Sequence, residues 1–185
     1  MAFDCRESPL TGLRVLERAP HADARGQFRR LFCPTELAPF GWATEVVQVN
    51  YSMTQSVGSV RGIHFQYPPY AEDKLVACVT GAVWDVAVDL RAGSPTFLRW
   101  HAEVLSAENG RSLLIPKGFG HGFQTLEPGS ALVYVHSAAY EPGAEGGIHP
   151  HDPRVGIEWP RAVAGLSDKD ASRPGLDASF RGITL

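Results

Sequence analysis

Hydrophobic and polar residues alternate along short stretches of the chain. From 47 to 52, valine and tyrosine side chains take every second position, with Gln48, Asn50 and Ser52 between them. This period of two predicts a strand with one polar face. The other runs rich in strand-forming residues are 74–79, 82–91, 111–115, 122–126 and 131–136. Turn residues separate these runs about every ten positions, which is typical of an antiparallel sandwich or barrel.

Two of these runs, 74–79 and 82–91, are joined only by Thr80-Gly81, which predicts that they pair as a hairpin. Helical patterning is confined to the short stretches 33–37 and 167–171, the first of which follows a β-rich run at 28–32. The end of the chain has many Pro, Gly and Asp residues and few strand-like runs. We expect it to wrap around the sheets as loops.

The composition is that of an ordinary globular protein. The 185 residues suffice for one domain, which we place at 1–185. Hydrophobic residues make up 44% and charged residues 20%, which excludes a disordered chain or a coiled coil. The net charge of -3 gives no general attraction to nucleic acid or to a membrane surface. The glycine motifs of dinucleotide-binding folds and P-loops are missing from the sequence, so we expect neither hydride transfer nor nucleotide hydrolysis.

The three cysteines, Cys5, Cys33 and Cys78, are odd in number and unclustered. They predict neither a disulfide framework nor a CxxC metal site, and they favour a reducing compartment. The first residues include charges where the apolar core of a signal peptide would stand, and no apolar run approaches the roughly 18 residues of a membrane span. We therefore predict a cytoplasmic protein.

Two stretches resemble the paired motifs of cupin jelly rolls. The first spans 58–81 and contains His64, and the second spans 110–121 and ends at His121. This resemblance implies an all-β fold, a cupin-type double-stranded β-helix (jelly roll) with short peripheral helices. Two positions that hold ligands in metal-binding cupins are here Gln66 and Lys74. Because a lysine ammonium offers only donors and positive charge, we predict that no metal binds.

Lys74 and the nearby Arg61 instead make the predicted pocket electropositive, which favours an anionic ligand or a developing oxyanion. Each candidate residue also has a purely structural interpretation. His64 could be a hydrogen-bonded core histidine, and His121 could follow a glycine turn for backbone reasons alone. A lone strand tyrosine such as Tyr134 is more often core than acid. The stretch 167–170 fits a helix start in which the carboxylate caps backbone donors.

Eight blocks of sequence carry a closer resemblance, to the dTDP-4-dehydrorhamnose 3,5-epimerase family. They are 23–28, 48–50, 61–66, 85–91, 115–123, 152–153, 157–160 and 166–170. The resemblance runs from about Leu10 to Pro174, nearly the whole chain. It implies a jelly-roll dimer that inverts carbons beside the ketone of a nucleotide-linked 4-keto-6-deoxy sugar, with neither metal nor coenzyme as cofactor.

The same resemblance places the family's base on His64, the carboxylate that orients it on Asp170, and the acid on Tyr134. It places the aromatic that stacks on the nucleotide base on Tyr140, and the N-terminal arm with Arg25 in the partner subunit's site. The substrate-binding positions implied in this way are Arg25, Phe28, Gln48, Asn50, Arg61, Lys74, His121, Tyr140, Glu145 and Lys169. No residue is implied as a metal ligand.

The chain departs from the family pattern at two places. Arg30 stands where the family usually has a glutamate that helps to hold the nucleotide, so thymine is the expected base without being fixed by the sequence. The stretch 136–139, His-Ser-Ala-Ala, stands where relatives more often have charged or hydroxyl residues. We expect this stretch to affect which carbon of the sugar is inverted.

The chemistry needs a base at the carbon beside the ketone and positive charge at the ketone oxygen, which His64 and Lys74 would supply. Inversion also needs a donor on the opposite face of the ring. Tyr134 would supply that proton, and a nearby cation would lower its pKa. A period of two puts Arg61 and His64 on opposite faces of a strand, so we expect a bulge between them.

Three other functions remain open on the sequence. One is a single-carbon epimerase or 3,4-ketoisomerase that acts on a related nucleotide sugar. Another is a metal-dependent cupin, against which Gln66 and Lys74 argue. The third is a non-catalytic jelly roll in which His64 and Tyr134 merely line a sugar cleft.

Overall fold

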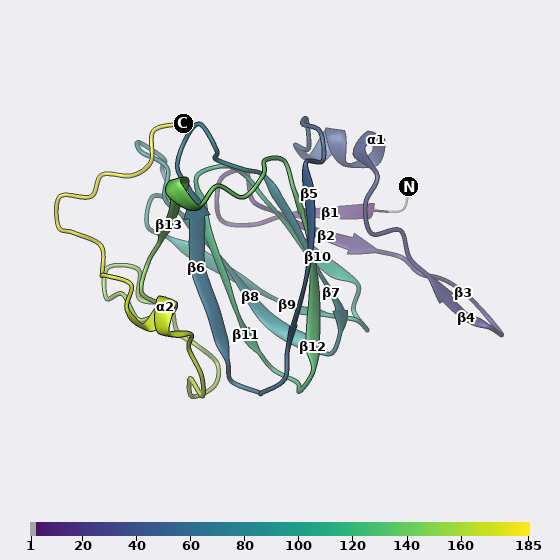
Figure 1. The fold of residues 1–185 in the computed structure, drawn as a ribbon. Coiled ribbons are helices and arrows are strands. Elements are labelled where there is room, and N and C mark those ends of the chain that lie inside the picture. Colours follow the sequence, from purple (N-terminus) through teal and green to yellow (C-terminus); the bar gives the residue numbers. More distant parts are fainter. Residues whose placement is uncertain (1–2) are drawn as a thin grey trace.

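The computed structural model describes residues 3–185, which form two antiparallel sheets facing each other (Figure 1). The six-stranded sheet contains, in spatial order, β1 (Phe3–Glu7), β2 (Arg14–Arg18), β10 (Arg111–Ile115), β7 (Lys74–Thr80), β12 (Ser130–His136) and β5 (Gln48–Thr54). The five-stranded sheet contains β13 (Glu145–Gly147), β6 (Val60–Gln66), β11 (Phe119–Thr125), β8 (Ala82–Asp89) and β9 (Trp100–Ser106). The cupin-type jelly roll predicted from the sequence is confirmed.

The remaining elements are small and peripheral. A hairpin of β3 (His21–Asp23) and β4 (Gly26–Phe28) projects away from the six-stranded sheet (Figure 1). The helical elements are α1 (Pro34–Leu37), the 3-10 helices η1 (Ala38–Phe40) and η2 (Pro142–Ala144), and α2 (Asp168–Ala171). Both predicted helices are therefore present. The predicted β-rich run at 28–32 is wrong, because β4 ends at Phe28.

The predicted hairpin between 74–79 and 82–91 is also wrong. The two strands exist as β7 and β8, but they belong to different sheets and each pairs with other strands. Gly81 makes the crossing between the sheets with a φ of +68°, and a Cβ atom there would lie 2.6 Å from Ser130 Oγ. A short turn signal marks where the chain changes direction, but it does not say whether the next strand stays in the same sheet.

Three hydrophobic clusters hold the layers together. One fills the space between the sheets, where Leu105, Leu113, Phe123 and Leu132 are at most 3% exposed. A second lies between the outer face of the five-stranded sheet and the C-terminal loops, which cover it as the sequence predicts (Figure 1). A third packs the region of α1 against the six-stranded sheet. Because Ile63 and Phe65 belong to the second cluster, the residue between them, His64, faces the other side of β6.

Within residues 3–185, no helix has the length and apolar character that crossing a membrane requires.

Candidate active site

An open cleft of about 980 Å³ lies between the two sheets. One wall comes from β5, β7 and β12, the other from β6 and β11, and the segment around α2 closes one side. The cleft brings together eleven of the candidate residues: Gln48, Asn50, Arg61, His64, Lys74, His121, Tyr134, Tyr140, Glu145, Lys169 and Asp170. These residues come from positions 48 to 170, so the fold, and not sequence proximity, assembles the site.

His64 and Asp170 form a close pair on one wall of the cleft, with His64 Nε2 2.5 Å from Asp170 Oδ1. Asp170 is 3% exposed, and its backbone N–H donates to Ser167 Oγ over 3.1 Å. The helix start predicted at 167–170 is therefore present, but the serine caps it, while the Asp170 carboxylate, expected to cap backbone donors of the helix, bonds to His64 and to the N–H of Gly62. Burial raises the pKa of the Asp170 carboxyl, but hydrogen bonds and the charge interaction with His64 outweigh it and leave the pKa below its usual value. The carboxylate therefore stays charged beside the imidazole.

The expected bulge lies between Arg61 and His64. His121 of β11 is opposite His64, whereas Phe123, two residues further, is opposite Arg61, so β6 has one extra residue there. Gly62 adopts a φ of +119°, and a Cβ atom would lie 2.5 Å from the Cα of Gly122. The bulge needs glycine for both reasons, and it turns Arg61 and His64 into the same cleft.

A second histidine–carboxylate pair lies deeper in the same wall. His121 Nε2 is 2.9 and 3.0 Å from the two carboxylate oxygens of Asp85, which is fully buried. Burial raises the pKa of Asp85 above its usual value, although His121 and Lys74 oppose this. The ring of His121 meets the ring of Tyr134 edge-on at 5.9 Å, so this pair supports the tyrosine from across the cleft.

Tyr134 projects into the cleft from β12 on the opposite sheet. The sequence predicts that a nearby cation lowers its pKa. Burial instead raises the pKa well above its usual value, Asp85 adds to the rise, and Ser52 and Arg61 only partly counter it. The prediction is wrong because desolvation of a buried phenolate exceeds the attraction of one partly exposed arginine. Tyr134 therefore keeps its proton at neutral pH.

Lys74 begins β7 and is 8% exposed. Its Nζ is 2.8 Å from Glu72 Oε1, in a pair whose side chains are both at most 10% exposed. The ammonium thus has a fixed partner on one side and lines the cleft on the other.

The other end of the cleft is organised around Glu145. Its Oε2 accepts hydrogen bonds from Tyr140 Oη over 2.5 Å and from Lys169 Nζ over 2.6 Å, and its Oε1 pairs with Arg173. Burial raises the pKa of Glu145, but the hydrogen bonds from Lys169 and Tyr140 and the charges of Lys169 and His64 outweigh this and leave the pKa below its usual value, so the carboxylate is ionised. The backbone N–H of Tyr140 donates to Gln48 Oε1 over 3.0 Å. Tyr140 itself is 51% exposed, with its ring open to the cleft.

The model of the dTDP-4-dehydrorhamnose 3,5-epimerase family matches residues 7–178. The chain belongs to this family. It is 44% identical over 168 residues to the dTDP-4-dehydrorhamnose 3,5-epimerase of Shigella flexneri, covering 90% of this chain and 92% of that one. The predictions of the family and of an isomerase-class enzyme are confirmed.

Solved structures of the epimerase family match the fold closely. The enzyme of Bacillus anthracis, with TDP and PPi bound, has a TM-score of 0.91 and 39% identity, covering 95% of this chain and 100% of that one. The enzyme of Legionella pneumophila, in complex with dTDP-4-keto-L-rhamnose, has a TM-score of 0.90 and 36% identity, covering 98% of both chains.

The chain is also similar to a relative that inverts one carbon. A 3'-monoepimerase from Streptomyces bikiniensis has been solved with dTDP as a double mutant, with a TM-score of 0.85 and 34% identity, covering 91% of this chain and 85% of that one. In that variant a histidine is replaced by asparagine and a tyrosine by phenylalanine. The two replaced residues are as far apart in that chain as His64 and Tyr134 are in this one.

The cupin positions of this epimerase-family member do not fit a metal ion. The amide of Gln66 is engaged at both ends by neighbouring protein groups, and Lys74 carries positive charge paired with Glu72. Among residues 3–185, no group of three or more His, Cys, Asp or Glu side chains could hold a metal. The side chains at these positions therefore do not supply the three or four neutral or anionic donors that bind Fe, Mn or Zn.

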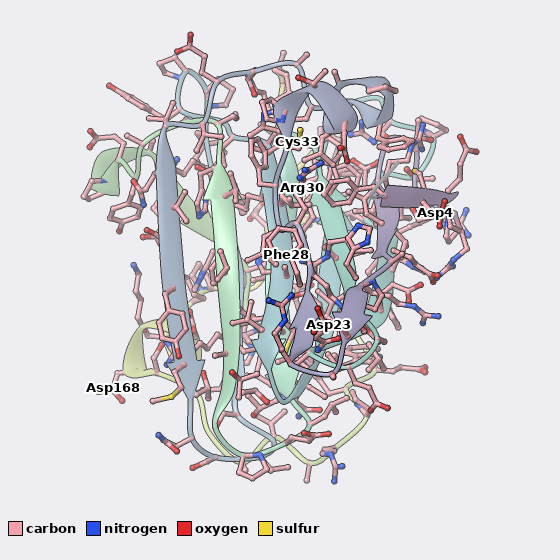
Figure 2. The ribbon with its side chains drawn as sticks, turned by 90° about the vertical axis from the view of Figure 1, so that its right-hand side faces the viewer. Asp4, Asp23, Phe28, Arg30, Cys33 and Asp168 are labelled. Atoms are coloured by element: carbon pink, nitrogen blue, oxygen red, sulfur yellow. The ribbon has the colours of Figure 1, made fainter. Side chains whose placement is uncertain are left out.

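Two predicted substrate contacts, Arg25 and Phe28, do not reach the cleft of their own chain. Both lie on the β3–β4 hairpin, and Figure 2 shows Asp23 and Phe28 standing in front of the six-stranded sheet. The Arg25 side chain is 90% exposed and pairs with Asp23 over 2.6 Å, and Phe28 is 63% exposed. Arg30 pairs with Glu36 and does not line the cleft either.

Three residues that contact Lys74, His121 or Tyr134 were missed as functional candidates: Glu72, Asp85 and His136. Asp85 begins one of the blocks that resemble the family and is an acid in a largely apolar strand, but neither signal assigns it a role; Glu72 is one of two acids before Lys74. His136 lies two residues after Tyr134, and its ring stacks on the tyrosine with an interplanar angle of 23°. Burial, Lys74 and His121 lower the pKa of His136 to about 4, so it is neutral at physiological pH.

Proposed function

We propose that this chain inverts C3 and C5 of a dTDP-linked 4-keto-6-deoxyhexose as a step in deoxysugar biosynthesis. One observation carries the proposal. A histidine oriented by an ionised carboxylate lies on one wall of a cleft, and a protonated tyrosine and a lysine lie on the other. This is the arrangement that removal and return of a proton on opposite faces of a sugar ring requires.

His64 acts as the base. Because the Asp170 carboxylate only accepts, His64 Nε2 donates to it, and Nδ1 is left with the free electron pair. Nδ1 takes the proton from the carbon beside the ketone, and the electrons of the broken C–H bond move to the ketone oxygen. The charged Asp170 stabilises the imidazolium that results.

Lys74 stabilises the negative charge of the enolate oxygen. Tyr134 then gives its phenolic proton to the opposite face of the carbon, so the configuration is inverted. The raised pKa of Tyr134 supports this role, because the group is protonated when the enolate forms. The proton gained by His64 and the one lost by Tyr134 exchange with solvent before the next inversion, which balances the cycle without a cofactor.

The remaining cleft residues bind the nucleotide part. Tyr140 offers an open ring for stacking on the base, and Arg61 and Lys169 supply positive charge for the diphosphate. Gln48, Asn50, His121 and Glu145 complete the set of polar contacts along the cleft. Each of these roles follows the family resemblance and is supported by the position of the side chain.

The protein acts as a homodimer in this proposal, with Arg25 and Phe28 reaching the partner's cleft. The hairpin stands away from its own cleft (Figure 1), and β5 is an edge strand whose outward residues Val49, Tyr51 and Met53 are 59%, 64% and 47% exposed. An apolar stripe on an open sheet edge is typical of a surface that another chain covers. Arg30 would then meet the partner's nucleotide. We place the dimer in the cytoplasm, which the three free cysteines within residues 3–185 support.

Co-expression of two defective variants tests the exchange of arms. Arg25→Ala removes the arm contact and His64→Asn removes the base. If arms cross, each mixed dimer has one intact site, and activity returns to about a quarter of the wild-type value. If each arm serves its own chain, no site is intact and the mixture is as inactive as its parents.

The reaction is tested by incubation with dTDP-4-keto-6-deoxyglucose in D2O, with NMR to follow deuterium at C3 and C5. Incorporation at both carbons with inversion is the expected result. Incorporation at neither carbon contradicts the proposal.

A single-carbon epimerase is the second candidate. The 3'-monoepimerase relative supports it, and so does the stretch 136–139, where this chain departs from the family pattern beside Tyr134. Deuterium at C3 alone in the same experiment selects this candidate.

A further inference from the structure

Gln66, the last residue of β6, holds the chain on both sides of Tyr140. Its Oε1 accepts a hydrogen bond from the backbone N–H of Glu141 over 2.7 Å, and its Nε2 donates to the carbonyl of Ala139 over 3.1 Å. A residue of a neighbouring parallel strand would make the same two bonds, one to the C=O before Tyr140 and one to the N–H after it. Gln66 is 5% exposed, so its amide fixes the segment that presents Tyr140 without facing solvent.

The same Gln66 amide also reaches the partner of Lys74. Its Nε2, whose two hydrogens are shared among three acceptors, also lies within hydrogen-bond distance of Glu72 Oε2 and, at 2.9 Å, of the carbonyl of Tyr70. The other carboxylate oxygen of Glu72 is 2.8 Å from Lys74 Nζ. A continuous set of contacts therefore leads from the segment around Tyr140, through Gln66 and Glu72, to Lys74.

We infer that Gln66 and Glu72 are positioning residues that set the nucleotide contact Tyr140 and the enolate-stabilising Lys74 together. The inference rests on the proposed function for the roles of Tyr140 and Lys74. A lysine amine sits at the end of a flexible stem, and a buried carboxylate that accepts one of its three protons limits the positions it can take. The other two protons remain for the substrate oxygen.

Two substitutions separate the two halves of this arrangement. Glu72→Gln keeps the size of the side chain and an oxygen that can accept from Gln66, but it removes the charge that holds Lys74. Gln66→Leu keeps the direct contact between Glu72 and Lys74, but it removes both bonds to the segment around Tyr140 and the bond from Gln66 to Glu72. Glu127→Gln is the matched control, since Glu127 is exposed in the turn between β11 and β12 and does not line the cleft.

The variants are measured by calorimetric titration with dTDP and by deuterium exchange of the keto sugar. We expect Glu72→Gln to slow exchange by about 10- to 100-fold while the Kd for dTDP changes by less than about two-fold. Glu72→Asp, which restores the charge on a shorter side chain, recovers part of the rate. Gln66→Leu raises the Kd for dTDP about ten-fold, and Glu127→Gln behaves as wild type.

Other outcomes overturn the inference. Exchange by Glu72→Gln at the wild-type rate shows that Lys74 does not depend on Glu72. A loss of exchange with an equal loss of dTDP binding in that variant shows general structural damage, and an unchanged Kd in Gln66→Leu shows that the amide does not set Tyr140. If the wild-type protein itself exchanges neither carbon, the proposed function fails, while the dTDP titration of Gln66→Leu still decides the role of Gln66.

Discussion

Two histidine–carboxylate pairs lie in the same wall of the cleft, and their surroundings differ. The His64 side chain is 38% exposed and its partner Asp170 has a lowered pKa, whereas the His121 side chain is 7% exposed and its partner Asp85 has a raised pKa. The Asp170 carboxylate accepts hydrogen bonds from the backbone N–H of Gly62 and from His64, while the Asp85 carboxylate is bonded to His121 within an apolar strand. The first pair can collect a proton from substrate, and the second holds a ring in place.

In the proposed mechanism, the same two residue types serve as a base or as a support, according to how accessible and how solvated they are. A base needs an open nitrogen and a partner that remains charged, and both conditions hold at His64. The support needs a fixed ring, and burial of Asp85 together with the edge-on contact to Tyr134 supplies it. Variants of the two pairs should therefore fail in different ways.

The largest expected effect separates the two histidines. His64→Asn should reduce deuterium exchange at C3 and C5 by about 10²–10⁴, the usual contribution of a general base. His121→Asn should slow exchange by no more than about ten-fold, because it loses a binding and supporting group but keeps the base. NMR of the substrate in D2O measures both. Equal losses in the two variants would mean that the pairs do not differ in function.

Tyr134→Phe should lower the rate of inversion by about 10² or more and leave measurable exchange, since the base still forms the enolate. The phenyl ring keeps the contact with His121, so folding is preserved. Product stereochemistry and deuterium content are read from one NMR sample. A variant that loses exchange as completely as His64→Asn would contradict the division of work between base and acid.

Substitution of the two carboxylates should have opposite effects, a loss mainly of activity at Asp170 and a loss mainly of stability at Asp85. Asp170→Asn should reduce activity by about 10²–10³ through the wrong tautomer of His64, with little loss of stability. Asp85→Asn should lower the free energy of unfolding by about 1–3 kcal/mol because a buried hydrogen-bonded group is replaced, with a smaller loss of activity. Urea denaturation and exchange rates on the same samples check both. If Asp85→Asn proves stable but inactive, Asp85 belongs to the machinery.

The sequence could predict the pair at His64 better than the pair at His121. Both pairs lie in blocks that resemble the family, but the resemblance assigns roles to His64 and Asp170 and none to Asp85. The bulge at Gly62 was expected because Arg61 and His64 had to share a face. The role of Asp85 depends on a contact with His121 of a neighbouring strand, which no local pattern contains. The same limit explains why the turn at Gly81 was assigned to a hairpin. Glu72 and His136 likewise gain meaning only when the two walls of the cleft are assembled.

The smallest expected effect concerns the wall that carries Tyr134. The pKa of His136 is lowered to about 4, so the unfolded chain binds its proton at a higher pH than the folded protein does. Stability is then lost as the pH falls below about 6.5, and the loss continues towards about pH 4. His136→Gln removes this group, so between about pH 7 and 5.5 wild type should lose about 1 kcal/mol more than the variant. Urea denaturation at both pH values measures the difference. Equal losses would mean that His136 accepts a proton in the folded cleft, and the wall opposite His64 would then tolerate a further positive charge.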